Sequence, residues 1–356
     1  MSIHTEFIKG RGSQINPNNK FLEKKYVQEF VEGLDEEFIK NNPTKFFKET
    51  PKKIISINNS PDLSFSQSIN PYQGCEHGCI YCYARNSHEY WGFSAGLDFE
   101  RKIIVKHNAA QLLEDALNKK GYIAKTIVLS GNTDCYQPIE RKLKITRSLL
   151  EIFNDYQHPV SIITKNNLIL RDSDLLKELA AKNLISVAIT INSLNESLRQ
   201  KMEPRTVTAK GRLNVIEKLS KEGIPVMLMC APIIPGLNSD EMPKLIKAAA
   251  DAGACSASFT MVRLNGAIAD IFTDWVNKTF PDRAEKILHG IQSSHGGHLN
   301  DSDWSRRMRG DGHLAESIHS LFKIAKDRYM KGRTPGPLRT DLFIPKKGKQ
   351  LNLFGD

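Results

Sequence analysis

Three cysteines lie close together in the stretch GCEHGCIYCYAR. Cys75, Cys79 and Cys82 have the spacing C-x3-C-x2-C, which brings three thiols into one short loop. Thiolates bind both zinc and iron–sulfur clusters, but a structural zinc ion takes four ligands. The spacing alone leaves two interpretations open: a four-iron cluster in which one iron has no protein ligand, or a zinc site completed by His77 or His88.

The composition is that of a soluble globular chain. Of its 356 residues, 40% are hydrophobic and 25% charged, enough for the core of one large domain. We find no apolar run of about 18 residues and no signal-peptide core in MSIHTEFIKGRG, so we expect a cytoplasmic protein without a membrane segment. In a reducing compartment the six cysteines are expected to be metal ligands, catalytic thiols or buried side chains.

A strand and helix alternation organises most of the chain. Short runs rich in Val, Ile, Leu and Met predict buried strands at 63–69, 126–131, 160–165, 185–191, 226–233 and 257–263. Segments of helical period lie between them, at 108–121, 139–156, 172–183, 208–223 and 239–253. Six such units predict an α/β fold with a parallel sheet. Because eight units close a barrel, we expect an open, partial (βα)6 TIM-like barrel.

Four regions follow from this pattern. We expect a polar N-terminal extension at 1–60, the barrel at 61–271, a C-terminal helical region at 272–334 and a flexible basic tail at 335–356. The loops after the carboxyl ends of parallel strands form the active sites of such barrels. The cysteine loop directly follows the first strand, so it belongs to that edge.

The loop resembles that of the radical S-adenosylmethionine (radical SAM) superfamily, which has C-x3-C-x-aromatic-C after the first strand of a six-unit barrel. Cys75, Cys79, Tyr81 and Cys82 match this pattern. The resemblance implies a [4Fe-4S] cluster bound by the three cysteines, with S-adenosylmethionine chelated by the fourth iron and Tyr81 against the adenine. It also implies reductive cleavage to a 5′-deoxyadenosyl radical that abstracts substrate hydrogen, and an electron donor such as flavodoxin or ferredoxin.

The same resemblance gives roles to polar residues at the strand ends. The loop after the second strand would meet the methionyl amine, which makes Gly131, Asn132, Thr133 and Asp134 candidates. For the cofactor carboxylate the candidates are the cations Lys165 and Arg205. For the ribose hydroxyls they are Thr190 and Asn192.

Within the superfamily, the segments ITKNNLILRDSDLL, TINSLNESLRQKMEPRT and APIIPG are similar to the spore photoproduct lyase and DNA-repair-photolyase-like branch. This implies a lyase or modifying enzyme acting on DNA in repair. One feature departs from the branch: Gly131 and Asn132 occupy the place of its hydrogen-returning cysteine. The nearby Cys135 is a candidate hydrogen donor in a different geometry, and core packing is its alternative.

Other substrates and another class of function stay open. The radical chemistry would equally suit RNA, a peptide or a small molecule. A zinc- or iron–sulfur-bearing nucleic-acid-binding module without catalysis is the alternative of another class. The net charge of +10 permits an anionic partner without requiring one.

The C-terminal region carries three further signals. WSRRMRGDGH places Trp304 among arginines, a combination found on nucleic-acid surfaces and also on ordinary solvated ones. HGGH, with His295 and His298, has a spacing that suits a metal, or is a polar loop. Finally, QLNLF resembles the pentapeptide that docks bacterial proteins on the DNA sliding clamp, matching it at Gln350, Leu351, Leu353 and Phe354.

Overall fold

The computed structural model describes residues 8–21 and 43–346. Its largest sheet has seven strands in the order β10-β9-β8-β7-β6-β3-β2, of which β2 is antiparallel to β3 and the other pairings are parallel. The strands are β2 (Ile55–Ile57), β3 (Gln67–Ile69), β6 (Ile127–Leu129), β7 (Val160–Thr164), β8 (Ile185–Thr190), β9 (Val226–Ile233) and β10 (Ser256–Met261). The six parallel strands coincide with the six predicted runs. The sheet is open in the described chain, which is consistent with a partial barrel.

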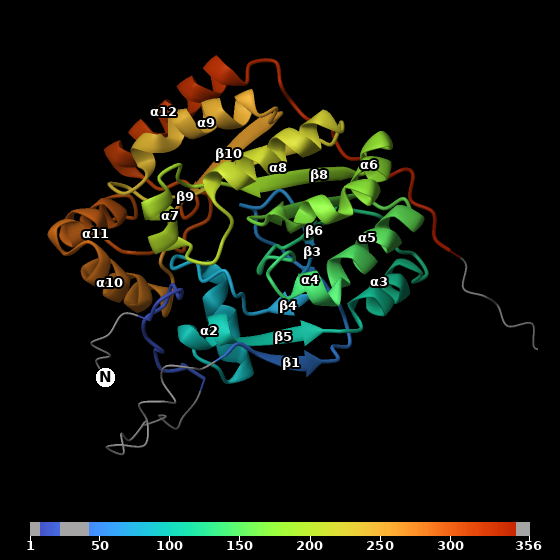
Figure 1. Cartoon of the computed structure of the whole chain (residues 1–356), viewed down its shortest axis with the longest axis horizontal. Coiled ribbons are helices and arrows are strands. Elements are labelled where there is room, and N and C mark those ends of the chain that lie inside the picture. The colour runs from blue at the N-terminus through green and yellow to red at the C-terminus, as the bar shows by residue number, and fades with distance from the viewer. Residues whose placement is uncertain (1–7, 22–42, 347–356) are drawn as a thin grey trace, which may run out of the picture.

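Helices that follow the parallel strands cover the outer side of the sheet (Figure 1). The covering helices are α3 (Ala109–Leu117), α5 (Ile145–Asp155), α6 (Ser173–Ala181), α8 (Ala209–Lys221) and α9 (Met242–Asp251). The connections also contain the short α4 (Glu140–Leu143), α7 (Glu196–Met202) and the 3-10 turns η2 (Asn167–Asp172) and η3 (Ser239–Glu241). Helix α7 packs with the cysteine loop instead, in one apolar cluster with Ile80. In α5 the buried positions Ile145, Leu149 and Phe153 recur at helical spacing and face the sheet. The single helix expected at 139–156 is divided because Lys144 has a left-handed backbone, with φ of 54°.

The cysteine loop is backed by a second, three-stranded sheet. In it β5 (Lys102–Lys106) pairs in parallel with β1 (Lys45–Glu49) and antiparallel with β4 (Tyr72–Gln73). A 3-10 helix, η1 (Tyr83–Trp91), and α2 (Leu97–Arg101) connect the loop to β5. Residues 43–60 of the extension expected at 1–60 therefore belong to the folded body, because they supply β1 and β2. Strand β1 was not predicted because its sequence, KFFKE, contains two lysines and lacks the apolar pattern of a buried strand. It is mostly exposed.

Residues 8–21 are held against the cysteine loop by buried polar contacts. Arg85 and Glu100 form a fully buried ion pair of 2.6 Å. Glu100 also accepts the backbone N–H groups of Gly12 (3.1 Å) and Ser13 (2.7 Å). A Cβ on Gly12 would lie 1.6 Å from the carbonyl oxygen of Gly78, so only glycine fits this crossing.

The C-terminal helices are α10 (Ile268–Thr279), η4 (Pro281–Arg283), α11 (Ala284–Ser293) and α12 (Gly312–Tyr329). The helical region thus begins at Ile268, four residues before the expected boundary. Helices α10 and α11 share an apolar core with the cysteine loop, in which Phe272, Trp275 and Ile287 pack with Ile80 and Tyr81. Helix α12 packs against α9, as Figure 1 also shows.

The first part of the expected flexible tail is packed instead. The backbone N–H groups of Arg339 and Ile344 donate to the carbonyls of Asn183 (2.9 Å) and Tyr156 (3.0 Å). Phe343 lies against the rings of Tyr122 and His158. Leu342 and Phe343 are partly buried by their apolar contacts, while most of the segment stays exposed. The QLNLF motif lies outside the described residues.

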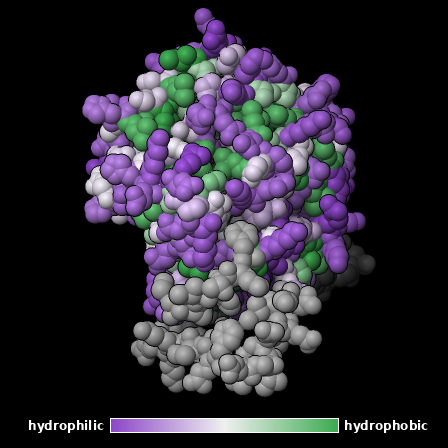
Figure 2. Space-filling model, turned by 60° about the vertical axis from the view of Figure 1, so that its left-hand side comes forward, coloured by the Kyte–Doolittle hydropathy of each residue, from purple (hydrophilic) through white to green (hydrophobic). Residues whose placement is uncertain are grey.

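The surface of the molecule is mixed. On the face shown in Figure 2, small groups of apolar residues are separated by hydrophilic ones. In residues 8–21 and 43–346 we find no helix that is both long and apolar enough to span a bilayer.

We predict that Gly12→Ala destabilises the protein by at least about 1–3 kcal/mol, because the new methyl group must displace the backbone at Gly78. Chemical denaturation would measure the loss. Gly336→Ala is the control, since a Cβ there meets nothing within 4 Å. Equal stability of the two variants would show that residues 8–21 do not hold the loop.

Candidate active site

The cysteine loop lies at the edge of the sheet formed by the carboxyl ends of the parallel strands, which we call the C-terminal edge. Cys75 and Cys79 are buried, Cys82 is partly buried, and all three thiols are free. Backbone hydrogen bonds fix the loop on two sides. The N–H of Cys75 donates to the carbonyl of Phe99 (2.9 Å), and the N–H of Ile80 donates to the carbonyl of Met202 (3.0 Å). The structure thus brings the three predicted ligands together in a loop that needs no metal to define its path.

The surroundings of the three thiols bear on which metal group the loop suits. Both ring nitrogens of His77 are near polar partners, with Asp134 at 3.4 Å and Asn166 at 3.3 Å. His77 is therefore engaged by other groups and is not free to complete a zinc site. Three thiolates suit a four-iron cluster in which each binds a different iron.

Burial also controls the protonation of this loop. It raises the pKa of each of the three thiols, so the metal-free cysteines are protonated at neutral pH. Cluster assembly must then release protons, as metal binding to thiols generally does. Burial lowers the pKa of His77 despite the nearby Asp134, so this ring is neutral.

Asp134 joins three neighbouring segments at the C-terminal edge. Its carboxylate accepts from the hydroxyl of Thr164 (2.8 Å) and the backbone N–H of Lys165 (2.9 Å), and it faces His77. The predicted loop at 131–134 is therefore tied both to β7 and to the cysteine loop. Asp134 is a positioning residue in this structure, and its predicted contact with the methionyl amine stays a prediction.

Gly131, Asn132 and Thr133 of this loop also form hydrogen bonds with neighbouring segments. The Thr133 hydroxyl donates to the carbonyl of Tyr72 (2.5 Å), and the Asn132 side chain donates to Ser87 (3.1 Å). The carbonyl of Gly131 accepts from the hydroxyl of Tyr83 (2.6 Å). These bonds hold the loop beside η1, directly after Cys82.

Tyr81 and Asn192 are in contact, and a buried network connects Thr190 to them. The Asn192 amide donates to the Tyr81 hydroxyl (3.1 Å), which in turn contacts Glu203. The Thr190 hydroxyl and the side-chain amide oxygen (Oδ1) of Asn192 are buried and have no hydrogen-bond partner in the described chain. Buried polar atoms are nearly always paired, so these two indicate that a polar ligand completes the site. A ribose or an adenine has the required donors and acceptors.

The two candidate cations differ in their surroundings. Arg205 faces Glu76 at 3.5 Å and is about one third exposed. Lys165 is partly buried, and its charge acts on Cys79, Cys82 and Glu203. Of the two cations, Lys165 is therefore the one whose charge acts on the thiols. A cation at this place suits a carboxylate bound next to the cluster.

Sequence reasoning missed a buried ion pair behind Tyr81. Glu203 and Arg212 are both almost fully buried and bonded to each other. Arg212 also donates to the carbonyl of Thr190 (2.8 Å). Burial alone would raise the pKa of Glu203, but Arg212, Lys165 and the Tyr81 hydroxyl lower it to about 2. The sequence did contain a signal for a buried arginine, because Arg212 lies on the apolar face of α8, in line with Val215 and Leu219.

Two expectations for lone residues are changed by the structure. Cys135 is fully buried in the main core, and its pKa is raised by burial and by Asp134, so it does not present a thiol to a substrate. Core packing also holds for Cys230. The Nε2–H of His295 donates to the carbonyl of Val262 (2.7 Å), which is a structural contact. Among the described residues, HGGH belongs to no group of three or more potential metal ligands.

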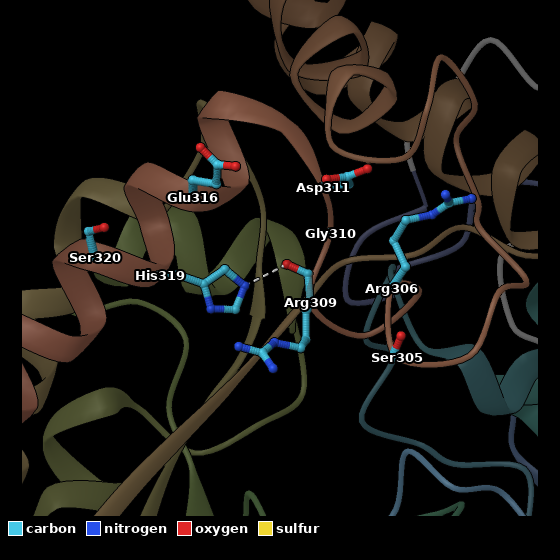
Figure 3. Close-up of a pocket in the computed structure, with 8 residues that line it drawn as sticks. All are labelled: Ser305, Arg306, Arg309, Gly310, Asp311, Glu316, His319 and Ser320. Atoms are coloured by element: carbon cyan, nitrogen blue, oxygen red, sulfur yellow. Dashed lines mark hydrogen bonds between the residues drawn. The ribbon is translucent and has the colours of Figure 1, made fainter.

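A pocket of about 530 Å³ lies elsewhere, in the C-terminal region (Figure 3). Its lining residues are Ser305, Arg306, Arg309, Gly310, Asp311, Glu316, His319 and Ser320. His319 is hydrogen-bonded to the carbonyl of Arg309 (2.9 Å), and Figure 3 shows the Arg309 side chain on the same side. The pocket contains none of the predicted cofactor residues, so it is not the candidate active site.

The fold and the loop together define an α/β enzyme with an iron–sulfur site at the C-terminal edge of a parallel sheet. A family model described as the radical SAM superfamily matches residues 69–249, and the chain belongs to this superfamily. An uncharacterised protein of Mycobacterium tuberculosis (strain ATCC 25618 / H37Rv) is 31% identical over 81% of this chain and 82% of its own length.

Two further comparisons are more distant. The radical SAM Nalpha-GlyT isomerase of Pseudomonas phage M6 is 26% identical over 62% of this chain and 45% of its own length. Spore photoproduct lyase complexed with dinucleoside spore photoproduct has the same fold, with a TM-score of 0.59, at 14% identity over 81% of this chain and 80% of the lyase chain.

Membership of the superfamily gives the cofactors, a [4Fe-4S] cluster and S-adenosylmethionine. Together they supply a radical that removes hydrogen from a substrate. In this chain Cys75, Cys79 and Cys82 are the residues that would hold the cluster. Lys165, Thr190 and Asn192 would bind the second cofactor, and these roles stay predictions.

We predict that alanine at Cys75, Cys79 or Cys82 abolishes cluster binding, with iron falling from about four atoms per chain to near zero. Iron analysis and visible absorption after anaerobic reconstitution would measure this. Cys255→Ala is a suitable control, because this partly buried thiol lies at the opposite end of β10. Full iron content in any of the three variants would remove that cysteine from the ligand set.

We predict that Thr190→Val weakens S-adenosylmethionine binding about tenfold, the effect of losing one hydrogen bond of roughly 1–1.5 kcal/mol. The free energy of unfolding of the cofactor-free protein should stay equal or rise, since the hydroxyl there has no partner. Calorimetric titration of the cluster-loaded protein and chemical denaturation would measure the two quantities. Unchanged affinity would show that the orphaned hydroxyl faces no cofactor.

Proposed function

We propose that this radical SAM enzyme acts on DNA, removing hydrogen from a base or sugar in a repair or modification reaction. The observation that carries the proposal is the match of fold, over 81% of the chain, to a lyase in complex with a dinucleoside photoproduct. The net charge of +10 adds support, since nucleic acid is an anionic partner. We also infer that the six strand and helix units curve into a partial barrel around this site.

The buried Cys135 argues for a reaction that differs from the lyase's in its last step. The branch that includes the lyase has a hydrogen-returning cysteine after its second strand, where this chain has Gly131 and Asn132. With Cys135 in the core, no thiol of the described chain replaces it at the same loop. We therefore propose a modification or isomerisation of DNA, rather than cysteine-dependent photoproduct reversal. The electron would come from a carrier such as flavodoxin or ferredoxin.

Isotope transfer tests the DNA substrate directly. The reconstituted, reduced protein would be incubated without oxygen with S-adenosylmethionine and perdeuterated oligonucleotides, untreated or irradiated, as DNA and as RNA of the same sequence. We expect deuterium in the 5′-deoxyadenosine released from the DNA reactions, detected by mass spectrometry. Cys79→Ala is the background control. Deuterium from RNA alone, or from neither nucleic acid, would contradict the proposal.

We further propose that QLNLF recruits the enzyme to the DNA sliding clamp, in the cytoplasm where both would meet the chromosome. A pull-down with purified clamp should retain the intact chain and lose the double variant Leu353→Ala, Phe354→Ala. Asn352→Ala is the matched control, because it occupies the variable position of the motif. Equal retention of all three proteins, or no retention of the intact chain, would refute the recruitment.

A further inference from the structure

Arg263 is a partly buried cation at the C-terminal edge of the sheet. It lies two residues after β10. The residues on either side are fixed, because Val262 donates its backbone N–H to Ile233 (2.9 Å) and Leu264 donates to Leu299 (2.9 Å). The backbone therefore presents the Arg263 side chain from a rigid position.

Next to it, Trp304 and Arg307 form an exposed aromatic and cationic unit. The Arg307 guanidinium lies 4.0 Å from the centroid of the Trp304 ring, which is 53% exposed. Arg307 is itself held by Asp62 (2.6 Å) and by Ser60 (2.6 Å), both from the segment before β3. One face of the indole is thus covered by a fixed cation, and the ring is held ready to stack on its other face.

Two hydrogen bonds connect these residues to the surroundings of the cysteine loop. Met261 at the end of β10 donates to the carbonyl of Met308, next to Arg307 (2.9 Å). The Asn86 side chain, from η1, donates to the carbonyl of Asn265 (2.7 Å). Helix η1 begins directly after Cys82. Arg263 is also an electrostatic neighbour of Tyr83, the first residue of η1. Arg263 and Arg307 therefore lie near the segment that directly follows the cysteine loop.

Around Arg263 and Arg307, positive charges outnumber negative ones. Asp62 is the acidic neighbour, and its carboxylate is already bonded to Arg307 and to the backbone N–H of Ser305 (2.6 Å). In the described chain Arg263 has no carboxylate within ion-pair distance, although burial and the charge of Arg307 lower its pKa. A guanidinium stays charged at neutral pH. One positive charge is left over, and an anionic ligand would neutralise it.

We propose that Arg263 binds a backbone phosphate of the nucleic-acid substrate and that Trp304 stacks on an adjacent unpaired base. This inference rests on the proposed function and specifies how its substrate is held. A guanidinium suits a phosphate, and an indole suits any base with a free face. Because bases within a duplex have no free face, the bound strand is single or has a nucleotide extruded from the helix.

Salt-dependent binding of a short oligonucleotide tests the proposal. Fluorescence anisotropy would be recorded for the cluster-loaded protein with a labelled single-stranded DNA of about 12 nucleotides, over a range of salt concentrations. Losing one phosphate contact on a single strand should reduce the slope of log K against log salt by about 0.7. We expect this for Arg263→Gln and recovery of the slope for Arg263→Lys. Trp304→Ala should weaken binding about tenfold with the slope unchanged, and Trp304→Phe should retain most of the affinity.

Arg339→Gln is the matched control, because Arg339 is half-exposed, paired with Asp341 and bonded to Asn183 just before β8, at the opposite edge of the sheet. It should bind like the unaltered protein. An unchanged slope in Arg263→Gln, or an equal loss in Arg339→Gln, would overturn the proposal, as would failure of the intact protein to bind at low salt. DNA binding that depends on Arg263 and Trp304 without deuterium transfer from DNA would instead refute only the proposed reaction.

Discussion

The buried ion pair between Arg85 and Glu100 is the interaction around which the active site is organised. A buried pair is stable only when its remaining donors and acceptors are also satisfied, and breaking one typically costs about 3–5 kcal/mol. Here Arg85 donates to the carbonyl of Cys79, and Glu100 accepts two N–H groups from residues 12–13. The pair thus joins the cysteine loop, α2 and the N-terminal segment, three parts of the chain that have no strand pairing with one another. The loop that binds iron is fixed by charges contained in the fold itself.

A second buried pair, Glu203 with Arg212, holds the loop from the other side through Tyr81. In the described chain, Thr190 and Asn192 beside Tyr81 each have an unsatisfied buried side-chain atom. The two ion pairs thus hold the cysteine loop in place, while these two atoms are open to a ligand. Such preorganisation lowers the ordering that cofactor binding requires.

Much of this could be predicted from the sequence, and the rest could not for identifiable reasons. The six parallel strands are continuous apolar runs, which stand out because both faces of the sheet are buried. Strand β1 carries lysines and is mostly exposed, so its pattern is that of a loop. The orientation of the Cys135 side chain could not be predicted from the sequence, since a residue beside a polar loop can face either the core or the solvent. The crossing at Gly12 depends on two segments 66 residues apart, and no local pattern encodes it.

The packed segment at 339–346 has a consequence for how the enzyme could be held on a larger assembly. Its contacts with Asn183 and Tyr156 lie at the starts of β8 and β7, whereas the thiols lie beyond the opposite ends of the parallel strands. The described part of this segment therefore lies on the side of the sheet opposite the thiols. A partner bound there would leave the catalytic face unobstructed, so that anchoring and turnover would not compete for the same surface.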